Sequence, residues 1–258
     1  MNNRFQKDLP SKIFKKLSNI FKINLPYERI PTISTGWDQY AKTFEQKNGK
    51  FLGDEWGIPE NMGIDVPREE VVSYIDKTIV EPHLGKCETI LEIGPGGGRF
   101  TQILLPKCKR LIAADTSRNM LKLLKQRFPE SNKIQYLLLD GHGLSSIQDI
   151  SVDSAFSYDV FVHLAPWDIA NYLLELKRVL KVGGKAIIHH GNTLSELGWK
   201  RFLEEMPKQL NTHKLPGTFT VMTPELIKEF VTRLGLNYEK SITNIAKRDC
   251  ISLISNHK

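Results

Sequence analysis

Residues 89–101 read T-I-L-E-I-G-P-G-G-G-R-F-T, and this stretch decides the fold. An apolar run ends in an acidic residue and a burst of glycines follows, which is typical of a buried strand that turns sharply into a helix. The first amide groups of such a helix are unpaired, so the turn predicts a site for a nucleotide-like ligand. A dinucleotide fingerprint, G-x-G-x-x-G, would place its third glycine at position 99, where this sequence has Arg99. The stretch therefore predicts a nucleotide-type site without the dinucleotide spacing.

Strands and helices alternate around this turn, a pattern that predicts an open, largely parallel sheet with helices on both faces. A helix is expected over 68–80, and a second from Pro224 to Leu234, with Thr223 as its N-cap. Two adjacent strands at the end of the chain predict an antiparallel edge. The remaining expected elements are strands at 88–94, 110–115, 134–139, 153–159, 185–190, 236–245 and 249–255 and helices at 98–106, 117–128, 167–181 and 196–210.

Glu92, Gly94, Gly96 and Gly98 form E-x-G-x-G-x-G, which resembles the first motif of class I S-adenosylmethionine (SAM)-dependent methyltransferases. Four later stretches resemble further motifs of that family in the same order: the strands ending at Asp115 and at Asp140, the strand at 152–164, and R-V-L-K-V-G-G with Val182 in place of the usual proline. Together they cover residues 85–192. The resemblance implies an α/β, Rossmann-like sheet, mostly parallel with an antiparallel C-terminal strand, helices on both faces and an N-terminal helical cap.

The resemblance implies S-adenosyl-L-methionine as cofactor and S-adenosylhomocysteine (SAH) as product. Ligands of open α/β sheets sit at the carboxyl ends of strands, and a carboxylate at Asp115 can accept hydrogen bonds from both ribose hydroxyls. The glycines let the backbone approach the ligand, and the positive end of the following helix is expected to face the methionine carboxylate. By resemblance Asp140 accepts a hydrogen bond from the adenine amino group, although a turn or N-cap role remains open. The expected cofactor-binding residues are Glu92, Gly94, Gly96, Gly98, Asp115, Thr116, Asp140, Gly141, His142 and Tyr158.

Two histidines are candidates for a catalytic base. The methyl group of SAM is already activated, so its transfer mainly requires that the acceptor be held close and aligned, and a hydroxyl acceptor would also gain from a base. His163 follows the fourth strand, and His190 ends the fifth, with His189 on the opposite face of that strand. The alternatives are that His163 only lines the cofactor and that His190 is a hydrogen-bonded structural residue. No metal ion is expected.

The predicted function is O-methylation of a small molecule, such as a sugar, a glycan or a secondary-metabolite hydroxyl. N-methylation and lipid or quinone methylation remain open, as do an NAD-dependent oxidoreductase and a non-catalytic SAM-binding protein. The formal charge is +7, and residues 1–30 hold seven basic and two acidic side chains, a local excess of +5. This uneven distribution argues against a nucleic-acid-binding face, because phosphate contacts would need basic residues over the folded domain.

Residues 1–67 are expected to form a basic N-terminal helix and a cap over the active site, and residues 68–258 the catalytic domain, with 192–222 as a substrate-side insertion. Apolar residues at helical spacing within 11–24 predict a helix that either rests on an anionic membrane surface or packs on the domain or on a second subunit of a homodimer. Three unpaired cysteines and the lack of a membrane-length apolar run predict a cytoplasmic protein, peripheral at the membrane if 11–24 binds lipid.

Overall fold

In the computed structural model, the described residues are 33–48, 51–54, 56, 59–212 and 218–257. The chain divides into two units, Met1–Thr32 and Ile33–Lys258, and every element below belongs to the second. The predicted basic helix at 11–24 lies outside the described residues, as do parts of the predicted cap and of the insertion.

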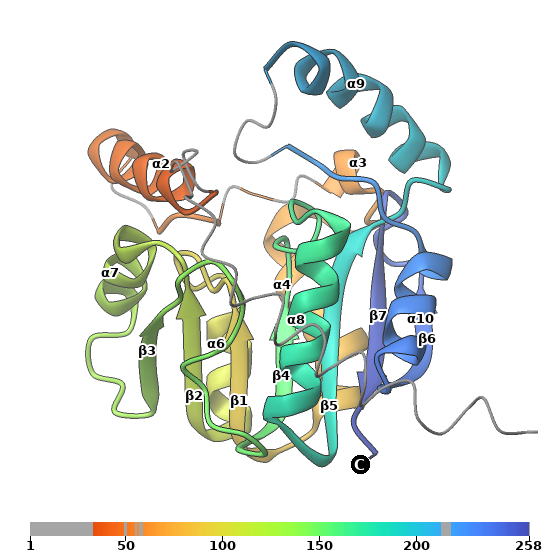
Figure 1. Cartoon of the computed structure of the whole chain (residues 1–258). Coiled ribbons are helices and arrows are strands. Elements are labelled where there is room, and N and C mark those ends of the chain that lie inside the picture. Colours follow the sequence, from red (N-terminus) through yellow and green to blue (C-terminus); the bar gives the residue numbers. More distant parts are fainter. Residues whose placement is uncertain (1–32, 49–50, 55, 57–58, 213–217, 258) are drawn as a thin grey trace, which may run out of the picture. The chain divides into compact units, whose positions relative to one another are not determined.

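The described residues form one seven-stranded sheet with the order β3-β2-β1-β4-β5-β7-β6 (Figure 1). Strands β1 to β5 pair in parallel, whereas β7 runs antiparallel to both β5 and β6. The predicted sheet with an antiparallel C-terminal strand is thereby confirmed. The strands are β1 (Cys87–Ile93), β2 (Cys108–Asp115), β3 (Ile134–Leu138), β4 (Val152–Ser157), β5 (Leu180–Gly191), β6 (Asn237–Ile242) and β7 (Asp249–Ser255).

Helices cover both faces of the sheet, because successive side chains of each strand point to opposite faces. In β1, Ile90 packs into one apolar cluster, whereas Leu91 and Ile93 pack into the other. The first cluster is covered by α4 (Val71–Ile75), α5 (Glu81–Leu84), α6 (Thr101–Leu104) and α7 (Arg118–Arg127), and the second by α8 (Pro166–Val179) and α10 (Pro224–Arg233).

Side-chain caps mark the start of two helices, and at the second of them the sequence predicted the cap. Ser117 accepts a hydrogen bond from the Met120 amide at 3.1 Å and begins α7, and Thr223 caps α10 in the same way through the Leu226 amide at 3.1 Å. The predicted helix at 98–106 is shorter than expected. Backbone φ is positive at Gly94, Gly96 and Gly98, so the chain stays non-helical until α6 begins at Thr101.

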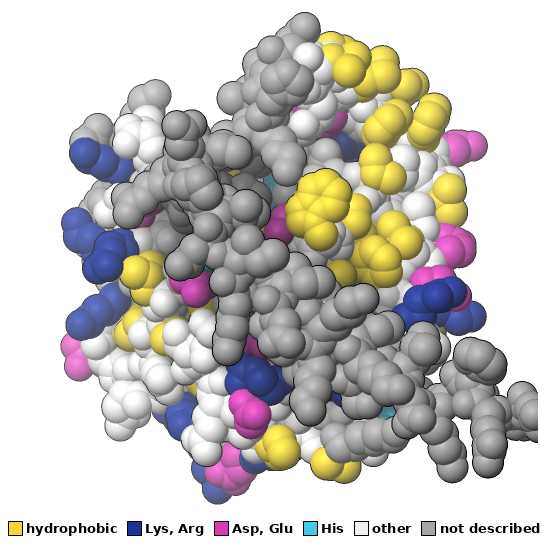
Figure 2. All heavy atoms as spheres, viewed as in Figure 1, with side chains coloured by type: hydrophobic (Ala, Val, Ile, Leu, Met, Phe, Trp, Pro, Cys, Tyr) yellow, Lys and Arg dark blue, Asp and Glu magenta, His cyan; other side chains and the backbone are white. Residues whose placement is uncertain are grey.

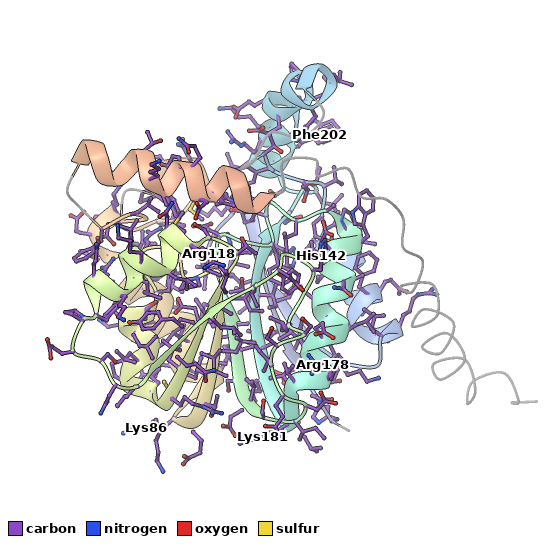
Figure 3. All side chains as sticks on the ribbon, turned by 60° about the vertical axis from the view of Figure 1, so that its left-hand side comes forward. Lys86, Arg118, His142, Arg178, Lys181 and Phe202 are labelled. Carbon is purple, nitrogen blue, oxygen red and sulfur yellow. The ribbon has the colours of Figure 1, made fainter. Side chains whose placement is uncertain are left out.

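Three further helices lie beyond the carboxyl ends of the parallel strands: α2 (Ile33–Asn48), α3 (Pro59–Met62) and α9 (Glu196–Thr212) (Figure 1). Figure 3 labels Arg118 and His142 at this edge of the sheet, and Lys86 and Lys181 at the opposite edge. In the described part of the chain, no helix has both the length and the apolar character needed to cross a bilayer.

Candidate active site

The glycine-rich turn after β1 is covered closely by another part of the chain. A Cβ atom at Gly97 would lie 2.1 Å from the carbonyl oxygen of Leu52, so glycine is required there. A Cβ atom at Gly96 would meet the Trp56 ring at 3.4 Å, an ordinary contact, but φ of +53° disfavours other residues. Leu52 and Trp56 therefore lie directly on the turn, which we call the glycine loop (94–98).

Glu92 secures the exit of the glycine loop. Its side chain is 2% exposed, and Oε2 accepts a hydrogen bond from the Thr101 hydroxyl at 2.7 Å. Burial raises the pKa of Glu92 to about 8, so this carboxyl group is protonated at neutral pH. The contact ties β1 to the first residue of α6. A direct contact of Glu92 with the cofactor remains a prediction.

Asp115 ends β2 with acceptor positions still available. Its carboxylate is 7% exposed and accepts the amide hydrogens of Ser117 at 2.8 Å and Gly96 at 3.3 Å. Burial raises its pKa to about 6, even though these amide hydrogen bonds act in the opposite direction. A carboxylate offers about four lone-pair positions, so at least one remains for a hydroxyl group of a ligand. Asp115 therefore fits a ribose, and the half-buried Thr116 lies beside it.

The loop after β3 is open to solvent. Asp140, Gly141 and His142 are exposed, and a Cβ atom at Gly141 would meet no atom within 4 Å. The Asp140 carboxylate accepts the His142 amide hydrogen at 2.8 Å, which closes a local turn of the kind given above as the alternative role. The second carboxylate oxygen leaves room for an adenine contact, which stays a prediction.

His163 has the tautomer that a general base requires. Its Nδ1 lies 3.2 Å from the carbonyl oxygen of Thr218, and because a carbonyl only accepts, Nδ1 must donate and Nε2 carries the lone pair. The ring lies between Trp37 and Phe219, with centroid separations of 5.3 and 5.0 Å. Burial lowers the pKa of His163, so the imidazole is neutral at physiological pH. Its catalytic role stays a prediction.

His190 has partners at both ring nitrogens. Nδ1 lies 2.8 Å from the carbonyl oxygen of Gly191, and Nε2 lies 2.8 Å from the Ser252 hydroxyl on β7. Burial lowers its pKa to about 4, so the ring is neutral and donates through Nδ1. This geometry favours the hydrogen-bonded structural role over the catalytic one.

The structure also brings together two acids, a histidine and an arginine that the sequence did not reveal as neighbours. His189 is fully buried, with Nδ1 3.4 Å from an Asp159 carboxylate oxygen and Nε2 3.4 Å from one of Asp249. Arg248 binds the Asp249 carboxylate, with Nε 2.9 Å from Oδ2. Although burial itself raises it, His189 and Arg248 bring the pKa of Asp249 below its ordinary value. Tyr158, an expected cofactor residue, stacks on His189 at 4.0 Å. In the sequence, the available signal for this group was the position of two acids, Asp159 after β4 and Asp249 at the start of β7.

Asp38 holds α2 against the start of α7. Its carboxylate accepts hydrogen bonds from the Ser117 hydroxyl at 2.7 Å and from the Asn119 amide at 2.9 Å, both at the start of α7. A negative charge is stabilised at a helix N-terminus. Asp38 thus anchors α2. The ring centroid of its neighbour Trp37 lies 5.9 Å from that of Trp56, which lies over the glycine loop.

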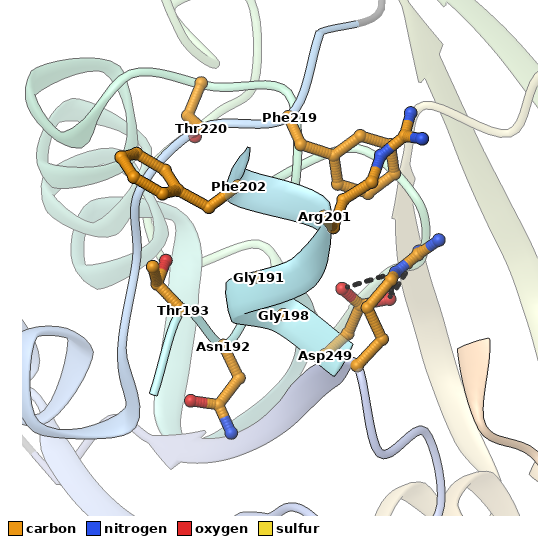
Figure 4. Close-up of a pocket in the computed structure, with 10 residues that line it drawn as sticks. Gly191, Asn192, Thr193, Gly198, Arg201, Phe202, Phe219, Thr220 and Asp249 are labelled. Atoms are coloured by element: carbon orange, nitrogen blue, oxygen red, sulfur yellow. Dashed lines mark hydrogen bonds and ion pairs between the residues drawn. The ribbon is translucent and has the colours of Figure 1, made fainter. Parts of the chain in front are cut away.

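A small pocket lies under α9, beside the carboxyl end of β5 (Figure 4). Phe219 lies between two guanidinium groups, 4.5 Å from Arg201 and 4.4 Å from Arg248. The Thr220 amide donates to the Val162 carbonyl oxygen at 2.9 Å, which ties this segment to the loop carrying His163. The pocket is lined by Gly191, Asn192, Thr193, Gly198, Arg201, Phe202, Phe219, Thr220, Arg248 and Asp249.

Comparison with known proteins finds methyltransferases among the similar proteins. Residues 91–188 match a family model described as a methyltransferase domain. An uncharacterized methyltransferase of Bacillus cytotoxicus is 23% identical over 192 residues, which are 73% of this chain and 84% of that protein.

Two solved structures share the fold. A SAM-dependent methyltransferase from Aquifex aeolicus matches with a TM-score of 0.54 and 17% identity. The match covers 78% of this chain and 98% of the Aquifex chain. One from Methanosarcina mazei matches with a TM-score of 0.55 and 17% identity, covering 69% and 97%. These matches confirm the resemblance that the glycine motif predicted.

Proposed function

Because residues 91–188 belong to the methyltransferase-domain family, within a fold shared with class I SAM-dependent methyltransferases, we propose that this chain binds SAM and methylates a small molecule. The acceptor group is a hydroxyl, as on a sugar or a secondary metabolite. SAM supplies a methyl group on a positively charged sulfur. A nucleophile can attack this methyl carbon directly, and SAH is then the leaving group. The protein's task is then to bind the donor, align the acceptor and receive the acceptor's proton.

The arrangement at Asp115 is the observation that carries the proposal. A buried carboxylate at the end of β2 accepts one amide hydrogen from the glycine loop and keeps at least one acceptor position for a ligand. The exposed Asp140–His142 loop follows β3, which is the neighbour of β2 in the sheet and lies on the side expected for adenine. Together these groups would hold the adenosine half of SAM at the carboxyl edge of the sheet.

His163 would receive the proton of the acceptor. Its Nε2 lone pair is available because Nδ1 donates to Thr218. Burial keeps the imidazole neutral, which is the state that accepts a proton. Segment 218–222 would form one wall of the acceptor site, since Phe219 contacts His163 on one side and the pocket under α9 on the other. Guanidinium, amide and hydroxyl groups in that pocket favour a polar acceptor.

Isothermal titration calorimetry with SAH and with NAD+ separates the donor classes. We expect SAH to bind the wild-type chain and NAD+ not to bind. Binding of NAD+ alone would refute the proposal in favour of an oxidoreductase. A second assay incubates the chain with radiolabelled SAM and sugars, phenols, amines or quinols. Transfer only to amines would refute O-methylation, and SAH binding without transfer to any acceptor class would favour a non-catalytic SAM-binding protein.

A lipid-linked acceptor is a second candidate, favoured by the surface of α9. Trp199, Leu203 and Leu210 are 51%, 45% and 71% exposed and recur at helical spacing, and Figure 2 shows hydrophobic side chains gathered over α9. Such a face can rest on a lipid surface and bring a membrane-embedded acceptor to the site. Co-sedimentation with liposomes tests this candidate: loss of binding in Leu203→Glu supports it, and absence of wild-type binding excludes it.

A further inference from the structure

Arg99 is buried without enough hydrogen-bond partners. The residue is 6% exposed, and neither Nη1 nor Nη2 has a hydrogen-bond partner among the described residues. The nearest carboxylate oxygen, Oδ2 of Asp159, is 4.0 Å from Nη1, which is too far for a hydrogen bond. Unpaired charged donors are costly to bury, so such a group indicates that a ligand completes its contacts.

Asp159 adopts a backbone conformation that few residues other than glycine adopt. Its φ is +59°, and the only other non-glycine residue with positive φ in the described part of the chain is Ile150. Such backbone strain costs about 1–3 kcal/mol and gathers at functional sites. His189 secures the strained residue, since the Asp159 amide donates to its Nδ1 at 3.1 Å. The Asp159 side chain is 20% exposed, so this backbone conformation leaves its carboxylate accessible to a ligand.

These two residues lie where the methionine end of a bound donor would extend. Arg99 directly follows the glycine loop, and Asp159 follows β4, the neighbour of β1 in the sheet. The two segments touch, because a Cβ atom at Gly94 would lie 2.3 Å from Val160 Cγ2. A donor with its ribose at Asp115, on the other side of β1, would cross the glycine loop toward them.

The charges of the pair match an amino-acid zwitterion. A guanidinium group binds a carboxylate through two parallel hydrogen bonds, and a carboxylate binds an ammonium group. The sequence predicted that the positive end of a helix would face the donor's carboxylate. Because α6 spans only Thr101–Leu104, that dipole is small, whereas Arg99 offers a full positive charge beside the loop.

We propose that Arg99 and Asp159 form a clamp for an α-amino-acid group, Arg99 binding its carboxylate and Asp159 its ammonium group. The clamp rests on the proposed function, because the group it holds is the methionine end of SAM and SAH. Arg99, which breaks the dinucleotide spacing, thereby becomes a determinant of donor specificity.

Calorimetry with three adenosine ligands tests the clamp without an acceptor. SAH carries both charged groups, its decarboxylated form keeps only the amine, and 5′-methylthioadenosine has neither. We expect Arg99→Met to weaken SAH binding about 10- to 100-fold while the affinities of the other two ligands stay within about threefold. Asp159→Asn should weaken SAH and decarboxylated SAH alike and leave 5′-methylthioadenosine unaffected. The matched control is Arg110→Met. Arg110 lies away from the site, and its guanidinium group donates a hydrogen bond to the Thr89 hydroxyl.

The outcomes separate the clamp from the proposed function. If Arg99→Met leaves SAH affinity unchanged, or weakens SAH and 5′-methylthioadenosine equally, the clamp is overturned. Wild-type protein that binds SAH no better than 5′-methylthioadenosine overturns the clamp alone. Wild-type protein that binds none of the three ligands overturns the proposed function and the clamp with it.

Discussion

Glu92→Gln should make the stability of this protein less dependent on pH. Burial raises the pKa of Glu92 from 4.5 to about 8, so the folded state holds a proton that the unfolded state releases between these values. Stability is therefore greatest below pH 4.5 with respect to this group, and it falls as the pH rises to 8. At 1.36 kcal/mol for each pH unit, the loss amounts to about 5 kcal/mol. Glutamine keeps an acceptor for the Thr101 hydroxyl and has no proton to lose.

Thermal unfolding of wild type and Glu92→Gln at pH 5 and pH 8 measures this difference. Between pH 5 and pH 8, we expect the melting temperature of the wild type to fall by about 10 °C more than that of the variant. The reason is that 1 kcal/mol shifts the melting temperature of a chain of this size by about 2–4 °C. Other acids, including Asp115, contribute to both proteins and cancel in the comparison. Glu88→Gln is the control: Glu88 lies on the same strand but is 61% exposed, in an ion pair with Lys109 at 2.7 Å.

Parallel unfolding curves for wild type and Glu92→Gln across this range would refute the reasoning, because Glu92 would then be ionised in the folded protein. The same variant bears on the cofactor. If Glu92 serves only to fix Thr101, SAH affinity in Glu92→Gln stays within about threefold of wild type. A loss of tenfold or more would instead support the predicted contact between Glu92 and the donor.

Three further substitutions probe the cap, the ribose site and the base. Asp38→Ala removes the hydrogen bonds to Ser117 and Asn119 and should lower the free energy of unfolding by about 1–3 kcal/mol, measured by urea titration. Asp115→Ala should weaken SAH binding about 10- to 100-fold, and wild-type affinity should fall as the pH drops below 6, because burial raises the pKa of Asp115 to about 6 and protonation removes the charged acceptor. His163→Gln should reduce methyl transfer about 10²- to 10⁴-fold with SAH affinity retained; loss of both would assign His163 a lining role.

The sequence predicted those parts of the molecule that local rules control. Alternating apolar strands and helices were enough for the sheet, and the predicted strand at 110–115 ends at Asp115, as β2 does. Thr223 and Pro224 marked the start of α10, because capping and the fixed φ of proline act within a few residues. Features that depend on a single segment were therefore readable without any knowledge of the fold.

Features that combine distant segments were not readable. Asp159, His189 and Asp249 come from the ends of β4, β5 and β7, and they meet because β7 inserts between β5 and β6. The register of β5 and β7 places Gly191 opposite Asp249, and nothing in either segment encodes that pairing. The role of His190 was unreadable for the same reason. Its hydrogen-bond partner Ser252 lies 62 residues away in the chain, so the sequence could not distinguish a catalytic role in the pocket from a structural, hydrogen-bonded role.

Helix α2 and the proposed cofactor site share one residue, Ser117, through which we expect them to be coupled energetically. The Ser117 amide donates to Asp115 at 2.8 Å, while its hydroxyl donates to Asp38 at 2.7 Å and accepts the Met120 amide hydrogen at 3.1 Å. Docking of α2 therefore orders the turn that holds Asp115, the residue proposed to bind the ribose. Linkage is reciprocal, so a donor that binds Asp115 must stabilise the docked cap by as much as the docked cap strengthens donor binding. SAH should accordingly raise the melting temperature of wild type more than that of Asp38→Ala.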